Sequence, residues 1–173
     1  MIAFLKGKLV EKHPTRIYVD VHGVGYEVHI PLSTFDKLPD INEDVYLLTH
    51  FYVREDAQRL FGFSSPGEKE MFLFLLSVSG IGPSIALAAL SGGSVSDLKM
   101  ALAGGQEDAL TSIPGIGKKT AARIIVELKD KVKPESELIK IIGKKKGSAV
   151  MENSVIEDAV SALISLGYKP NAA

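Results

Sequence analysis

Hydrophobic and polar positions alternate through the first third of the chain, as in β-strands that bury one face. The alternation is clearest in RIYVDVH, residues 16–22, and turn residues such as Gly23 separate the segments that carry it. The predicted strands cover residues 2–10, 16–22, 25–31, 45–53 and 59–63, with a short helix or turn at 32–38. Five short strands in so small a segment indicate a small barrel, and both an oligonucleotide-binding (OB) barrel and an SH3-like barrel fit the pattern.

The pattern changes to a helical period after residue 63. The connector GFSSPG, residues 62–67, marks the predicted boundary between a barrel at 1–63 and an all-helical domain at 64–133. The predicted helices cover 68–78, 83–90, 97–103 and 118–132, the last being the longest, and residues 106–112 lead into it. Ser94 or Ser96 is expected to cap the third of these helices, and glycine pairs are expected to end the second and third.

The composition shifts again towards the end of the chain. Residues 134–153 contain a proline, two glycines and a run of three lysines, Lys144 to Lys146, and are predicted to be a flexible linker. The lysine run is interpreted as solvated in preference to bound to DNA. Residues 154–173 have helical spacing and predict one amphipathic helix, which is marginal alone and needs partners. They are therefore interpreted as the start of an incomplete third, helical domain.

Two segments of the helical region repeat each other. SGIGPSIAL at residues 79–87 aligns with PGIGKKTAA at 114–122, an offset of 35 residues. Because each copy has a helical pattern on both sides, two duplicated helix-turn-helix units are favoured over two unrelated glycine-containing connections. The pattern is similar to the helix-hairpin-helix motif of sequence-independent DNA-binding proteins.

The repeated turns are candidate anion-binding sites. Glycines leave room for a phosphate oxygen, and the helix that begins at Lys118 presents unpaired amides and the positive end of its dipole. Lysines at a helix N-terminus oppose the dipole, which suggests an anionic partner. The candidate DNA-binding residues are Gly80, Ile81, Gly82, Ser84, Gly115, Ile116, Gly117, Lys118, Lys119, Thr120 and Arg123.

Composition limits the classes of function. An apolar content of 46% over 173 residues predicts a folded protein, and the absence of cysteine excludes disulfides, thiolate catalysis and cysteine-ligated zinc. No stretch resembles a signal peptide or a membrane span, so a soluble cytoplasmic protein without a membrane partner is expected. The net charge is −1, and residues 64–133 carry 8 basic and 7 acidic side chains. DNA contact would therefore depend on local placement and backbone amides instead of a global positive field.

Catalytic patterns are weak. The four histidines, at 13, 22, 29 and 50, show no metal-binding spacing, and GIGKKT lacks the four-residue gap of GxxxxGK[ST], so neither a metal, a cofactor nor ATP hydrolysis is expected. An enzyme hypothesis remains as a helix-hairpin-helix glycosylase or nuclease with Asp130 or Lys129 beside the second turn. A general duplex-binding repair adaptor is a further alternative.

Longer motifs carry a family resemblance over nearly the whole chain. MIAFLKGKLVEK, HGVGYEVHIP, FYVREDAQRLFGF, IPGIGKKTAARIIVELKDK and SALISLGYKP together resemble the RuvA family of bacterial Holliday-junction-binding proteins. The resemblance implies an OB-type barrel, a tandem helix-hairpin-helix domain, a linker and a small helical domain that contacts the hexameric RuvB ATPase. It also implies a non-enzymatic homotetramer that holds four-way DNA junctions open for branch migration in recombination and repair. The RuvC resolvase is a candidate further partner, and one or two tetramers per junction both fit.

The resemblance also assigns roles to residues outside the repeated turns. Glu55 and Asp56 would form an acidic pin at the tetramer centre, whereas the residue pattern alone is typical of a polar β-turn. Leu163, Leu166 and Tyr168 would contact the motor. Two departures stand out: Ser84 occupies a position where the family commonly has lysine, and only the first of three expected C-terminal helices precedes Ala173. A truncated chain and a naturally short one both fit, and weak coupling to the motor is expected.

Overall fold

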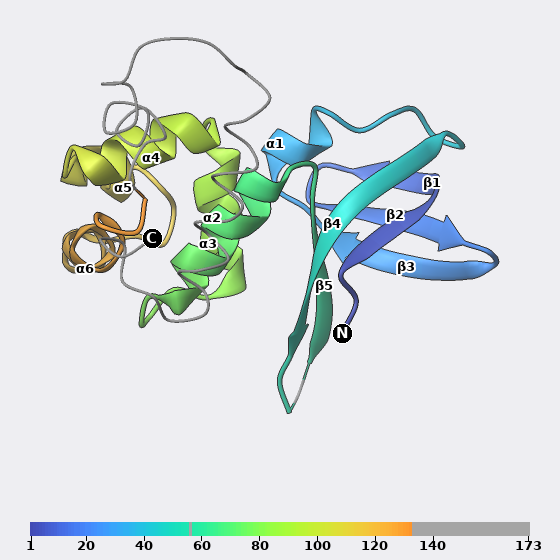
Figure 1. Ribbon diagram of the computed structural model, residues 1–173, viewed down its shortest axis with the longest axis horizontal. Helices are drawn as coiled ribbons and strands as arrows, with labels where there is room; N and C mark the ends of the chain where they lie inside the picture. Colours follow the sequence, from blue (N-terminus) through green and yellow to red (C-terminus); the bar gives the residue numbers. More distant parts are fainter. Residues whose placement is uncertain (56, 133–173) are drawn as a thin grey trace, which may run out of the picture. The chain divides into compact units, whose positions relative to one another are not determined.

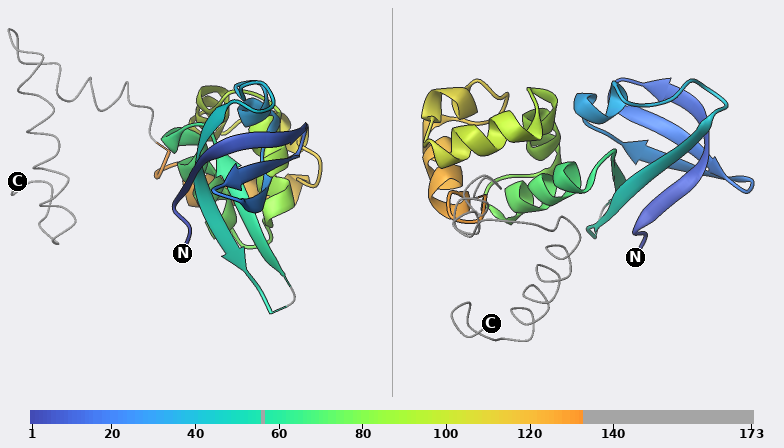
Figure 2. Two further views of the ribbon diagram at one scale, coloured as in Figure 1. Left: turned by 90° about the vertical axis from the view of Figure 1, so that its right-hand side faces the viewer. Right: turned by 45° about the horizontal axis from the view of Figure 1, so that its top comes forward.

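Five strands near the N-terminus form a closed barrel (Figure 1). The structure is a computed structural model and describes residues 1–55 and 57–132. The strands are β1 (Phe4–His13), β2 (Arg16–Val21), β3 (Val24–His29), β4 (Asp44–Val53) and β5 (Gln58–Phe63). They neighbour one another in the order β1-β2-β3-β5-β4, and only β3 and β5 pair in parallel. The predicted five-stranded OB-like barrel is confirmed, and Figure 2 shows its strands curving around a common interior.

The alternating pattern fills that interior. The buried side chains of the barrel are Leu5, Leu9, Ile17, Val19, Val28, Ile30, Leu38, Val45, Leu47 and Leu60. Strand β1 runs three residues beyond its predicted end, because its second half pairs with β2 after a bulge between Leu9 and Glu11. His22 and Gly23 connect β2 to β3 with φ angles of 53° and 88°, the left-handed torsions that a two-residue hairpin turn requires.

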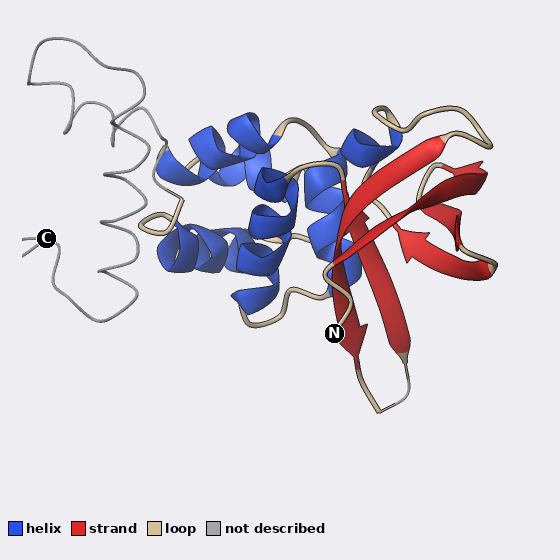
Figure 3. Ribbon diagram, turned by 45° about the vertical axis from the view of Figure 1, so that its right-hand side comes forward, coloured by secondary structure: helices blue, strands red, loops and turns tan. Residues whose placement is uncertain are grey.

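Six helices lie in the described residues (Figure 3, blue). Helix α1 (Leu32–Phe35) connects β3 to β4. After β5 come α2 (Pro66–Ser77), α3 (Pro83–Ser91), α4 (Val95–Ala103), α5 (Glu107–Thr111) and α6 (Lys118–Leu128). Ser94 is the cap of α4, one of the two serines predicted for that role.

The predicted extent of α6 was wrong. The helix ends at Leu128, four residues early, and its 11 residues are fewer than the 12 of α2. Val132 is nevertheless buried, and its N–H donates to the Leu128 carbonyl at 3.0 Å. The apolar spacing of a helix therefore continues past the last residue of α6, which explains the overestimate.

The apolar core of the helices extends into the barrel. Phe61 and Phe63 of β5 belong to the same buried cluster as α2, and the ring centroid of Phe72 on α2 lies 5.1 Å from that of Phe61 and 4.9 Å from that of Phe63. Residues 1–55 and 57–132 accordingly belong to one compact unit. The division into domains at 1–63 and 64–133 stays a prediction.

Several predictions concern residues outside the described ranges. These are Asp56, the linker at 134–153 with its lysine run, and the helix at 154–173 with Leu163, Leu166 and Tyr168. Within the described ranges, no single helix has the length and apolar character needed to cross a bilayer. Helices α3 and α4 meet those two criteria only when taken together, with a bend of 103° between them.

Candidate nucleic-acid interface

The first Gly-Ile-Gly turn joins α2 to α3. Gly80 has a φ angle of +91°, a conformation that side-chain-bearing residues rarely adopt. The Ile81 N–H donates to the Val78 carbonyl at 3.1 Å, and the Ile81 side chain is buried. Gly82 then precedes the first residue of α3 with extended torsions, φ −97° and ψ 172°. The turn is thus fixed by one left-handed glycine and one buried isoleucine.

The second turn repeats this geometry 35 residues later. Gly115 has a φ angle of +89°, and the Ile116 N–H donates to the Ile113 carbonyl at 3.0 Å. The side chain of Ile116 is buried, and Gly117 precedes α6 with φ −90° and ψ 170°. The sequence repeat is therefore also a structural repeat.

Each turn contacts the helix that follows the other turn. Arg123 of α6 donates from Nη1 to the carbonyl of Ser79 in the first turn at 3.2 Å. In the other direction, a Cβ placed on Gly115 would lie 3.1 Å from Cγ1 of Ile85 on α3. These contacts join the two repeats, which are 35 residues apart in sequence. Arg123, predicted as a phosphate ligand, uses at least one of its five N–H donors to join the turns.

The helices that follow the turns begin without side-chain caps. In α2 and α4 a serine closes the start, since Ser65 accepts from the Glu68 N–H at 3.3 Å and Ser94 from the Asp97 N–H at 3.1 Å. Helices α3 and α6 begin after glycines, and no side chain caps their first amides. Uncapped amides at a helix N-terminus are suited to bind an anion.

The side chains in the first turns of α3 and α6 differ. Lys118 and Lys119 are exposed in the first turn of α6, and among the described residues neither belongs to an ion pair. Thr120 beside them is half-buried. In α3 the corresponding residues are Pro83, which has no N–H, and the exposed, neutral Ser84. Positive charge is therefore concentrated at the second turn.

Two of the candidate residues contribute differently from the rest. The side chains of Ile81 and Ile116 are only 6% and 4% exposed, because both point into the helical core. A ligand at the turns could reach their backbones alone. Their side chains hold the turns in place.

The tip of the β4–β5 hairpin carries the predicted acidic pair. The Arg54 N–H donates to the Ala57 carbonyl at 2.8 Å, which closes the turn, and Glu55 is exposed within it. Sequence reasoning missed Arg54, although the run VRED contains it. Its Nε donates to the Tyr52 hydroxyl at 2.7 Å, and its guanidinium lies 5.2 Å from the centre of that ring. The basic side chain is thereby held by Tyr52.

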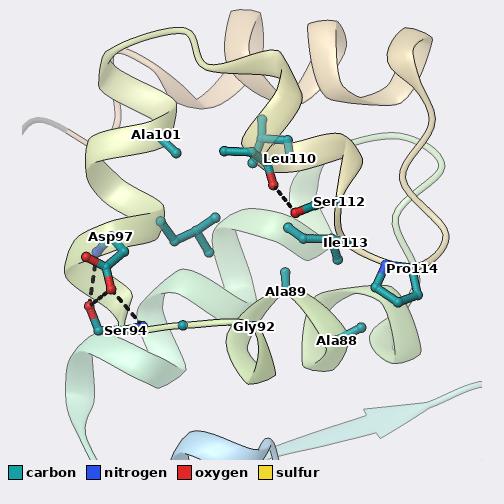
Figure 4. A pocket seen from close by; sticks show the side chains of 13 residues that line it. Ala88, Ala89, Gly92, Ser94, Asp97, Ala101, Leu110, Ser112, Ile113 and Pro114 are labelled. Atoms are coloured by element: carbon teal, nitrogen blue, oxygen red, sulfur yellow. Dashed lines mark hydrogen bonds between the residues drawn. The ribbon is translucent and has the colours of Figure 1, made fainter.

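A cavity of about 390 Å³ lies between α3, α4 and α5, with Pro114 at its edge (Figure 4). Its walls are mostly alanine, glycine, leucine and isoleucine. Asp97 is the one titratable residue that lines it, and hydrogen bonds from the Ser94 hydroxyl and N–H lower the pKa of that carboxyl. The cavity therefore offers no acid poised for proton transfer near neutral pH.

The other catalytic candidates lie apart from the turns. Lys129 and Asp130 are exposed just after the end of α6, roughly 16 Å from its first residue by the rise of an α-helix. Burial lowers the pKa of His29 and of His50, and His13 lies 3.4 Å from a Glu11 oxygen. Within residues 1–55 and 57–132, no three acidic, histidine or cysteine side chains are grouped to hold a metal ion.

A closed five-stranded barrel joined to two adjacent, glycine-turned helical hairpins defines a protein of the barrel and tandem helix-hairpin-helix class. Residues 1–62 match the RuvA N terminal domain, and residues 72–130 match the SAM-like helix-hairpin-helix tandem. The chain belongs to the RuvA family.

Curated relatives support that assignment over the whole chain. The Holliday junction branch migration complex subunit RuvA of Pseudomonas syringae is 47% identical over 176 residues, which cover 100% of this chain and 87% of the relative. The protein of the same name from Leptothrix cholodnii is 49% identical over 173 residues, covering 100% and 86%. That from Nitrosomonas eutropha is 49% identical over 168 residues, covering 97% and 83%.

Proposed function

We propose that the chain is a non-catalytic scaffold that binds four-way (Holliday) DNA junctions by their shape and recruits a RuvB-type ATPase for branch migration in recombination and repair. The observation that carries the proposal is the pair of uncapped helix starts, which belong to two repeats joined through Arg123 and Ile85. The relatives described above are named as subunits of a Holliday junction branch migration complex, which agrees with it.

The chemistry of this surface favours DNA backbone over bases. Amide N–H groups and lysines bind phosphate oxygens, which are the same at every nucleotide, so such contacts position DNA without reading its sequence. Two turns a fixed distance apart can contact two places on one duplex arm. Selectivity for a junction would then come from the arrangement of several chains, four in our proposal, around the crossover.

The acidic turn fits this proposal as a repulsive element. With four chains, Glu55 and Asp56 would contribute eight carboxylates at the centre, where they would repel phosphates and disfavour a continuous duplex across it. Replacing the pair by Glu55→Gln and Asp56→Asn should raise affinity for plain duplex and reduce the junction-to-duplex preference while the oligomer persists. An unchanged preference at several salt concentrations would restore the interpretation as a polar turn.

Partners beyond DNA belong to the same proposal. The RuvB-type motor would bind the region of Leu163, Leu166 and Tyr168, a RuvC-type resolvase could share the junction, and a cytoplasmic location suits all three. The alternative of a helix-hairpin-helix enzyme gains no support from the described residues, since the cavity near the second turn lacks a poised acid and Asp130 lies at the far end of α6.

A gel-shift series would test the proposal. A four-way junction, a duplex and a single strand of matched sequence are titrated with the protein, and the same samples are assayed for strand incision. We expect tightest binding to the junction and no incision. Equal affinity for junction and duplex would favour the repair adaptor, and incision would favour the enzyme.

A further inference from the structure

Glu68 is the one charged side chain in the buried class among the described residues, with 1% of its surface exposed. It lies in the first turn of α2, the helix that leads from the barrel to the first Gly-Ile-Gly turn. A buried carboxylate is unfavourable unless neighbouring groups satisfy it. The hydrogen-bond partners of Glu68 therefore show which segments of the chain its carboxylate joins.

Those contacts come from two segments of the chain, one between β3 and β4 and one after β5. Oε2 accepts hydrogen bonds from the Thr34 hydroxyl of α1 at 2.8 Å, and from the Ser64 N–H and hydroxyl in the connection after β5 at 2.9 and 2.7 Å. Oε1 lies 3.2 Å from Nζ of Lys37, just beyond α1. The carboxylate thus ties the start of α2 to the segment between β3 and β4 as well as to the end of β5.

The carboxylate is held in its ionised form. Burial by itself would raise the pKa of Glu68, but the hydrogen bonds from Ser64, Thr34 and Lys37 together hold it below its ordinary value. An uncharged amide at this position has a single oxygen. If that oxygen accepts from Thr34 and Ser64, the NH2 group faces the Lys37 ammonium, which is itself a donor, and the negative charge beside Lys37 is lost.

A second anchor holds α2 one turn further along. Phe72 packs on Phe61 and Phe63 of β5, and its ring edge meets His50 of β4 at a centroid distance of 5.8 Å. Met71 and Leu75 of the same helix are buried in the same cluster, so apolar packing holds α2 along its length. The hydrogen bonds of Glu68 add a directional constraint at the start of the helix, where it leaves the barrel.

We propose that Glu68 is a positioning residue: its buried carboxylate fixes the direction in which α2 leaves the barrel, and thereby where the two DNA-binding turns lie relative to the β4–β5 hairpin. The inference rests on the proposed function for its consequence, because a junction requires the turns and the hairpin tips of several chains to be in register. Binding to a duplex, which the turns alone would contact, does not require this register.

The orientation can be measured without DNA. The chain has no cysteine, so Val24→Cys on the barrel and Met100→Cys on α4, both at exposed positions, would each accept one spin label. Labelled chain is mixed with excess unlabelled chain, so that each measured distance belongs to a single molecule. We expect a narrow distance distribution in the parent protein and a broader one in Glu68→Gln. Glu127→Gln on α6 is the control, since it makes the same chemical change on an exposed carboxylate that belongs to no ion pair among the described residues.

Thr34→Val is the second variant, for the case in which Glu68→Gln does not fold. It preserves the shape of a buried side chain and removes one hydrogen bond to the carboxylate, and it should broaden the distribution to a smaller extent. A variant that lowers the melting temperature but leaves the distribution as narrow as that of the control would overturn the inference.

Junction and duplex affinity supply the functional measurement. Glu68→Gln should bind the junction roughly tenfold more weakly, and bind duplex with unchanged affinity. An equal loss of affinity for junction and duplex would mean that Glu68 supports the fold without orienting the turns. A parent protein without junction preference would instead overturn the proposed function, while the distance measurement would still decide the role of Glu68.

Discussion

The two Gly-Ile-Gly turns share a backbone and differ in the residues that follow it. Their glycine φ angles, +91° and +89°, and their closing hydrogen bonds, 3.1 and 3.0 Å, agree closely. After the first turn come Pro83 and Ser84, and after the second come Lys118 and Lys119. The duplication therefore preserved the geometry that presents amides, while charge is confined to one copy.

Glycines within each turn also serve different purposes. Gly80 and Gly115 have positive φ angles that the turn requires. Gly82 and Gly117 have ordinary negative φ angles, and a Cβ at either would meet nothing within 4 Å. The backbone does not demand glycine there, so the open space above the first amides is the feature that these two glycines provide.

The largest expected effect is on stability, and it should differ between substitutions at Gly80 and Gly115, the two turn glycines with positive φ angles. Gly80→Ala should lower the free energy of unfolding by about 1–2 kcal/mol through its φ angle alone. Gly115→Ala has the same strain and also places a Cβ 3.1 Å from Ile85, so its free energy of unfolding should fall by about 2–3 kcal/mol. Urea unfolding of both variants gives the difference. Equal decreases in the free energy of unfolding would show that Ile85 moves away from the new methyl group at no energetic cost.

The second-largest effect is expected on DNA binding, when the positive charge after the second turn is removed. Lys118→Ala combined with Lys119→Ala should weaken binding to all DNA sequences alike and reduce the magnitude of the salt slope by about 0.9 for each phosphate that a chain no longer neutralises. Lys129→Ala, at the other end of α6, is the matched control and should leave the slope unchanged. If the double variant keeps the parent slope, these lysines are ordinary solvated side chains.

A smaller effect should come from filling the space above the amides. Gly117→Ala and Gly82→Ala should leave the free energy of unfolding within about 0.5 kcal/mol of the parent, because neither position is crowded or left-handed. Both should weaken junction binding by about 1 kcal/mol, since the new methyl group obstructs a phosphate at the helix start. Parallel unfolding and gel-shift measurements check the two parts, and undiminished binding would place the phosphate elsewhere.

The smallest expected effect comes from adding a positive charge after the first turn, which tests whether the absence of charge alone limits its binding to phosphate. Ser84→Lys should raise affinity and increase the magnitude of the salt slope by about 0.9 per chain, because its backbone already matches that of the second turn. Ser84→Ala controls for removal of the hydroxyl. No increase in affinity with lysine would mean that phosphates do not approach the first turn within reach of this position.

Sequence periodicity predicted the barrel strands and the order of the helices, and the glycine repeat predicted both turns. These features depend on torsion and on the alternation of apolar residues, which are local properties of the chain. The same reasoning extended α6 too far, because Val132 continues the apolar spacing although the helix ends at Leu128. An apolar residue at helical spacing predicts burial, but it does not show whether the backbone at that residue is still helical.

Only the tertiary structure decided how the parts meet. The bond from Arg123 to Ser79, the packing of Ile85 on Gly115, and the burial of Glu68 against Thr34 join residues 30 or more positions apart. Glu68 is an acidic residue in the first turn of α2, where acids are favourable at the surface, so nothing in the sequence marked it as buried. Local patterns fix which elements form, whereas long-range contacts depend on how those elements pack, so the sequence alone located the two turns but not the surface that they make together.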